Sequence, residues 1–120
     1  MDRIKWIDAR GKKILYVDWS GLKKLEDLTE VLNEAVKVAV ASPTKLLTIS
    51  DFTDAAASSE FMDLINKAGK EVFDNKSEKS AVLGISGVKS ILLQGYLRVT
   101  GAKNMKVCSS RDDAINYLTL

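Results

Sequence analysis

The residues best suited to chemistry lie in the stretch DFTDAAASSEF, residues 51 to 61. It offers two carboxylates, Asp51 and Asp54, and two adjacent hydroxyls, Ser58 and Ser59, just before an apolar run. A carboxylate pair could support catalysis, but no second cluster of ligands accompanies it, and aspartate commonly bonds its own backbone in such loops. We therefore expect both aspartates to cap turns, and an enzyme that uses them is the least favoured alternative.

The chain contains no histidine and only one cysteine. Histidine is the usual general base, a common metal ligand and the usual activator of a serine or cysteine nucleophile. Cys108 stands beside Met105 and Val107 on an expected strand, where a partly buried, unreactive thiol is favoured over a nucleophile. These counts predict a protein that is not an enzyme and that has no metal site and no cofactor.

The segment GISGVKS, residues 84 to 90, lies between an expected strand and an expected helix and superficially resembles a phosphate-binding loop. A Walker motif has four residues between its glycines and a lysine directly after the second. Here two residues separate Gly84 from Gly87, and Val88 precedes Lys89, so the motif is absent. Gly87 and Lys89 are candidate contacts for a small anion at the helix start, with a plain turn as the alternative.

The spacing of apolar residues predicts the elements that position these side chains. The runs IKWID and KKILYVDW predict an N-terminal hairpin, and apolar residues three and four apart predict a helix from Lys24 to Ala41. The other expected elements are a strand over 45–50, a helix over 59–75, a strand over 79–86, a helix over 88–100, an edge strand over 103–108 and a last helix beginning at 109–113.

Strands that are joined through helices form parallel sheets with right-handed crossovers. We therefore predict an α/β fold with a single, mostly parallel sheet of about five strands, opened by the N-terminal hairpin. Leu47 and Ile49 alternate with Thr48 and Ser50, which is typical of a sheet with one covered face. The four helices are accordingly expected to lie largely on one face.

Length and composition limit the class of protein. A chain of 120 residues is long enough for one core and too short for two, so residues 1–120 are expected to form a single domain. The net charge of +2 is too small for a nucleic-acid binder. The N-terminus lacks the apolar stretch of a signal peptide, and no window is apolar enough for an integral membrane segment, so we expect a cytoplasmic protein.

The order of elements, with LLTISDFTDAAASSEFMDL at its centre, resembles the STAS domain of bacterial anti-sigma factor antagonists and of some anion-transporter tails. The segments YVDWSGL, GISGVKSILL and MKVCSSRDDAINYL look like those of small stand-alone STAS-like proteins of bacteria and archaea, many without an assigned activity. The likeness covers nearly the whole chain. It implies a non-enzymatic regulatory or protein-interaction module whose partner is a protein, such as a regulatory kinase or an anti-sigma-type factor.

The resemblance also assigns a role to Ser58. In the antagonist branch a strand leads to Asp-Ser-Ser/Ala-Gly-Leu at a helix start, and the first serine accepts phosphate. That serine falls on Ser58, whereas Ala57 and Glu60 replace the aspartate and the glycine. Ser58 is thus a candidate phosphoacceptor within an interaction face of Asp54, Ser59 and Glu60. The alternative is that Ser58 only caps the helix, since Glu60 would oppose a phosphate charge.

The expected helix over 88–100 has apolar residues over more of its surface than one buried stripe requires. That surface could bind a partner protein or a second copy of the chain, giving a homodimer. It could also cover a pocket for a small apolar or lipid ligand, with Leu92 and Tyr96 as contacts, and carriage of such a ligand is the alternative function. A helix that is simply buried against its neighbours is the third possibility.

Overall fold

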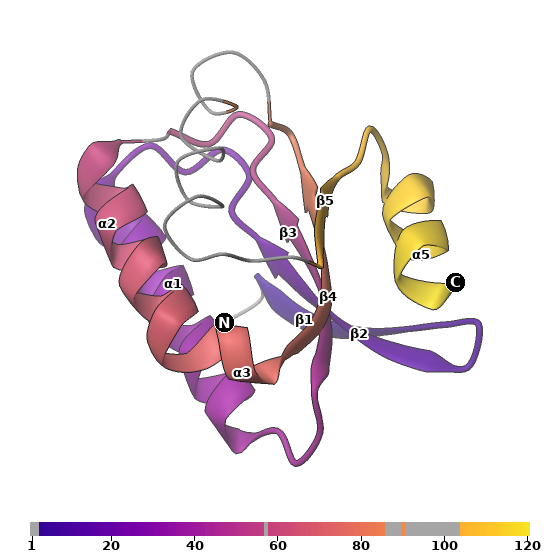
Figure 1. The fold of residues 1–120 in the computed structure, drawn as a ribbon. Coiled ribbons are helices and arrows are strands. Elements are labelled where there is room, and N and C mark those ends of the chain that lie inside the picture. The colour runs from indigo at the N-terminus through magenta and orange to yellow at the C-terminus, as the bar shows by residue number, and fades with distance from the viewer. Residues whose placement is uncertain (1–2, 57, 86–89, 91–103) are drawn as a thin grey trace.

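A computed structural model of the chain describes residues 3–56, 58–85, 90 and 104–120 (Figure 1). Its centre is a five-stranded sheet in the order β1-β2-β3-β4-β5. The first two strands pair antiparallel and the other neighbours pair parallel. The strands are β1 (Ile4–Ala9), β2 (Lys12–Asp18), β3 (Leu46–Asp51), β4 (Ser77–Leu83) and β5 (Met105–Val107). The predicted mixed sheet with its N-terminal hairpin is thereby confirmed.

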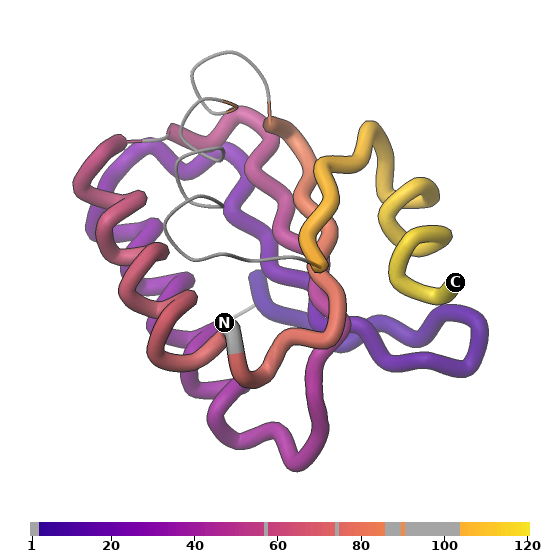
Figure 2. Tube along the Cα trace, in the orientation of Figure 1, coloured from indigo at the N-terminus to yellow at the C-terminus, as the bar shows by residue number. Residues whose placement is uncertain are grey.

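The hairpin turns through Arg10 and Gly11, whose φ angles are 52° and 78°. Two central residues with positive φ form a type I′ turn, whose twist matches that of the flanking strands. The turn lies beneath the last helix (Figure 2), where the Arg10 guanidinium donates a hydrogen bond to the Thr119 hydroxyl at 3.2 Å.

The described helical segments largely follow the expected positions. They are α1 (Leu25–Ala41), α2 (Ser59–Ala68), the π-helical turn η1 (Gly69–Phe73), the short α3 (Asp74–Lys76) and α5 (Arg111–Thr119). The helix expected over 59–75 is therefore regular only to Ala68 and ends in η1 and α3. The helix expected over 88–100 lies outside the described residues. No helix within the described ranges is long and apolar enough to cross a membrane.

The helices cover both faces of the sheet (Figure 1). α1 and α2 lie on one face, as expected, whereas α5 lies on the other and corrects the expectation for that helix. We call the two buried clusters the α1/α2 core and the α5 core. The α1/α2 core contains Leu15, Val17, Trp19, Leu28, Val31, Leu32, Ala35, Ala39, Leu46, Ala55 and Phe61. The α5 core contains Ile14, Leu47, Ile49, Ala81, Leu83, Cys108, Ala114 and Leu118.

β3 explains why the sheet needs cover on both faces. Its residues from Leu46 to Ile49 are all buried, and consecutive side chains of a strand point to opposite faces. Leu47 and Ile49 pack into the α5 core, so the apolar stripe faces the single helix α5. Thr48 on the other face is also buried, and its hydroxyl is satisfied there by donating a hydrogen bond to Ser80 at 2.9 Å. The alternation of polar and apolar residues in β3 therefore does not mean that one face of the sheet is exposed.

Candidate functional site

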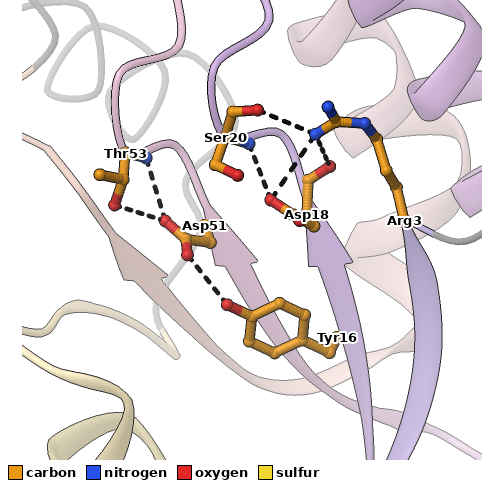
Figure 3. A network of polar contacts seen from close by, with 6 residues as sticks. All are labelled: Arg3, Tyr16, Asp18, Ser20, Asp51 and Thr53. Carbon is orange, nitrogen blue, oxygen red and sulfur yellow. Dashed lines mark hydrogen bonds and ion pairs between the residues drawn. The ribbon is translucent and has the colours of Figure 1, made fainter.

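β2 and β3 end in two related tripeptides, DWS and DFT, at the carboxyl edge of the sheet (Figure 3). Their aspartates, Asp18 and Asp51, are register partners on neighbouring parallel strands. Each Oδ1 accepts a hydrogen bond from the backbone N–H two residues on, at 2.8 Å from Ser20 and 3.0 Å from Thr53. The expectation that Asp51 caps a turn is confirmed, and Asp18 does the same on β2.

The remaining oxygen of Asp51 reaches the α5 side of the sheet. It accepts a hydrogen bond from the Tyr16 hydroxyl at 2.9 Å, while Oδ1 also accepts one from the Thr53 hydroxyl at 2.7 Å (Figure 3). Partial burial, followed by the hydrogen bond and the charge of Asp51, raises the pKa of Tyr16 to about 12. The Arg111 guanidinium, 4.9 Å from the Tyr16 ring centre, acts in the opposite direction. Tyr16 is therefore a neutral hydrogen-bond donor and not a base.

Arg3 connects β1 to the end of β2. Its Nη1 donates hydrogen bonds to the carbonyl oxygens of Ser20 at 2.8 Å and Asp18 at 3.3 Å, and lies 3.8 Å from the Asp18 carboxylate (Figure 3). Both side chains are more than a third exposed. Water screens such pairs, so this ion pair contributes little stability and mainly orients the loop.

The aromatic residues of the two tripeptides lock the loops together. Trp19 and Phe52 stack with ring centres 5.2 Å apart and planes 10° apart. Phe61 in the first turn of α2 packs edge-on against both, at 5.4 Å from Trp19 and 6.4 Å from Phe52. Stacked and edge-on pairs are the preferred aromatic arrangements. The start of α2 is therefore held against the ends of β2 and β3.

A glycine after β4 completes this edge. Gly84 has φ +76°, and a β-carbon there would overlap the backbone nitrogen of Thr53 and lie 2.6 Å from its Cα. The chain after β4 thus lies so close to the DFT backbone that position 84 has room for glycine but not for a residue with a β-carbon.

The exposed part of the site is the start of α2. The Ser58 hydroxyl accepts a hydrogen bond from the Phe61 N–H at 3.2 Å, which confirms that Ser58 caps this helix. Ser59 and Glu60 follow it in the first turn and are exposed. Asp54 is exposed in the loop before the helix. It was expected to cap a turn with its side chain, but it shapes this loop through its backbone, which has φ +56°.

The loop that contains Leu22 and Lys23 contacts the loop that contains Asp54. The Ala56 N–H donates a hydrogen bond to the Leu22 carbonyl at 2.8 Å, and the exposed Lys23 ammonium donates one to the Asp54 carbonyl. We call Lys23, Asp54, Ser58, Ser59 and Glu60 the α2-start surface. Asp54, Ser59 and Glu60 were expected to form an interaction face with Ser58, and that role stays a prediction. Lys23 was not expected, because only folding brings its loop beside Asp54.

The other predicted contacts, Gly87, Lys89, Leu92 and Tyr96, lie outside the described residues, so the anion site and the ligand pocket stay predictions. Cys108 is 7% exposed, and burial raises the pKa of its thiol. Among residues 3–56, 58–85 and 104–120, no three His, Cys, Asp or Glu side chains gather as a metal site would require.

Sequence reasoning missed the pairing of DWS with DFT. Both tripeptides consist of an aspartate, an aromatic residue and a hydroxyl residue, and both follow an expected strand, so this repetition was a usable signal. The contact of Tyr16 with Asp51 had no such signal, because it joins residues on two different strands. Chemically, the described edge offers hydrogen-bonded carboxylates and a neutral phenol.

A solved structure with the same architecture is that of an uncharacterised protein of the DUF3478 family from Shewanella loihica PV-4, which has a SpoIIAA-like fold. The TM-score is 0.66 at 16% sequence identity, over 96% of this chain and 91% of that chain. No family model and no curated protein sequence matches the chain. The structural match shows that the chain has a SpoIIAA-like, STAS-like fold.

Proposed function

We propose that this SpoIIAA-like chain is a non-enzymatic regulatory module that binds a partner protein through the α2-start surface, with Ser58 as a phosphorylation switch. The observation that carries the proposal is the position of Ser58. Its side chain is exposed at the first turn of a helix whose start is fixed by the aromatic cluster of Trp19, Phe52 and Phe61. A rigid base with an exposed hydroxyl suits a surface that is recognised and modified.

Charge explains how modification would act. A phosphate carries roughly −1.5 to −2 charges, and a helix N-terminus stabilises negative charge through its free N–H groups and dipole. Within this surface Lys23 contributes positive charge, whereas Glu60 contributes negative charge. Phosphorylation would therefore change the charge presented to a partner while the helix stays capped.

The absence of an assembled catalytic group among the described residues supports a role without chemistry. The carboxylates of Asp18 and Asp51 accept backbone hydrogen bonds, and the thiol of Cys108 is buried. The Thr53 hydroxyl does donate a hydrogen bond to Asp51, but the same carboxylate also accepts the Thr53 N–H and the Tyr16 hydroxyl, so it holds the loop in place and is not set up to activate a nucleophile.

The test compares Ser58→Asp with a matched control, Ser110→Asp. Ser110 caps α5 as Ser58 caps α2, by accepting a hydrogen bond from the N–H three residues on, and both serines are exposed. Aspartate is also a good N-cap, so each variant changes charge and keeps its helix. Proteins retained by wild type and by each variant would be identified by mass spectrometry after affinity purification from the source cells.

We expect a protein that binds wild type and Ser110→Asp but is lost with Ser58→Asp. Ser58→Ala should retain it, because alanine adds no charge. An identical set of bound proteins for all four forms would contradict the proposal, as would loss of binding with Ser110→Asp alone.

A further inference from the structure

β1 forms one edge of the sheet, and no described strand pairs with its outer side. The direction of its backbone groups follows from its pairing with β2. The Asp18 N–H donates a hydrogen bond to the Arg3 carbonyl at 2.8 Å, so odd-numbered residues of this segment point their backbone groups toward β2. The N–H and C=O groups of Ile4, Trp6 and Asp8 therefore point outward. Such a row of groups is a template for another strand.

The side chain at the centre of this edge is a tryptophan. Trp6 pairs with Leu15 of the α1/α2 core, so its side chain lies on the α1 side of the sheet, yet it is 50% exposed. Edge strands are usually protected by charges, proline or short length. Lys5 and Asp8 do place charges on this strand, but Trp6 leaves a large apolar side chain exposed in the middle of its six residues.

We infer that a second copy of the chain pairs with this edge, antiparallel and with the two-fold axis at Trp6. Such an axis, perpendicular to the sheet, keeps each face continuous between the copies. Ile4 then pairs with Asp8 of the second copy, and Trp6 pairs with its own counterpart. All outward-pointing residues of the strand find a partner, which gives about six backbone hydrogen bonds.

The neighbouring symmetric registers are poorer. An axis at Ile7 leaves Ile4 unpaired and gives about four hydrogen bonds. An axis at Lys5 also gives about four, and it places Lys5 directly opposite the same lysine of the second copy, where like charges destabilise a sheet.

The side chains fit the register at Trp6. The two exposed tryptophans become cross-strand neighbours on the α1 side, which is a favourable aromatic pair. Asp8 faces Ile4 of the second copy, and on the other side of the sheet Lys5 faces Ile7. No like charges lie directly opposite within the described strand. The resulting dimer has one continuous sheet built from both copies.

The inference is independent of the proposed function, because none of these residues belongs to the α2-start surface. The experiment is sedimentation equilibrium of the full chain over a series of concentrations. We expect wild type to show a monomer–dimer equilibrium. Trp6→Lys places two ammonium groups together at the axis and should raise the dimer dissociation constant by about tenfold or more.

Two further variants keep the experiment decisive. Val40→Lys introduces the same side chain at another exposed apolar position, 62% exposed on α1, and should dimerise as wild type does. Asp8→Pro removes an N–H that points away from β2, so it should abolish dimerisation while the hairpin keeps its own hydrogen bonds. Circular dichroism of each variant verifies the fold.

Three results would overturn the inference. The first is a wild-type chain that stays monomeric at every concentration. The second is unchanged dimerisation in a folded Trp6→Lys or Asp8→Pro variant. The third is a Val40→Lys variant that loses the dimer as completely as Trp6→Lys does.

Discussion

Tyr16 shows how a single residue responds to its contacts. Burial and the hydrogen bond to Asp51 raise its pKa from 10.0 to about 12. A pKa that is higher in the folded than in the unfolded chain means that the neutral form stabilises the fold. This contribution is fully present below pH 10 and is lost as the pH rises through about 12. We expect Tyr16 to ionise later than an exposed tyrosine, and Asp51→Asn to bring its pKa down.

The phenolate absorbance of wild type, Asp51→Asn and Tyr16→Phe over an alkaline pH series would measure this. Tyr16→Phe serves as the control, because it should remove the component that titrates near pH 12. Loss of a component near pH 10 instead would show that the Tyr16 hydroxyl is not held by Asp51.

At the scale of elements, the carboxyl edge of the sheet depends on one close backbone contact. Gly84→Ala forces an alanine to adopt φ +76° and pushes its β-carbon into the Thr53 backbone. Gly11→Ala is the matched control, because Gly11 has φ +78° but no atom within 4 Å of an added β-carbon. We expect Gly11→Ala to cost about 1–2 kcal/mol from its backbone conformation alone, and Gly84→Ala to cost clearly more.

Urea unfolding gives the free energy of unfolding for each variant. Equal losses for the two substitutions would mean that the loop after β4 can move away from Thr53 without cost. The contact would then not hold the DFT loop in place.

At the scale of the whole molecule, the two cores share one sheet, so we expect them to unfold together. Leu118 is fully buried in the α5 core, and Leu118→Ala should cost about 2–5 kcal/mol. Leu120→Ala is the control, because Leu120 is 87% exposed and its loss should change stability by less than about 0.5 kcal/mol. The effect should reach Trp19, which lies in the other core.

Trp19 fluorescence reports this coupling when Trp6, the other tryptophan, is replaced by phenylalanine. In that background the Trp19 unfolding transition should move to lower urea with Leu118→Ala and should coincide with the transition seen by circular dichroism. An unchanged Trp19 transition would show that α5 unfolds separately from the rest of the sheet.

Local patterns in the sequence determined most of the elements. The spacing of apolar residues located α1 and the strands, and the Arg10-Gly11 pair specified the hairpin turn, because both depend on residues close together in the chain. The cap of α2 by Ser58 is local for the same reason, since its hydroxyl bonds an N–H three residues on. The interruption of the second helix after Ala68 was not visible in that spacing.

Only the tertiary structure decided which face each helix covers and which loops meet. The alternation in β3 suggested one covered face, but Thr48 is buried, with its hydroxyl bonded to Ser80 on another strand, and α5 covers the opposite side. The contacts of Tyr16 with Asp51 and of Gly84 with Thr53 likewise join segments far apart in the chain. Such contacts depend on strand order and register, which no local spacing of residues encodes.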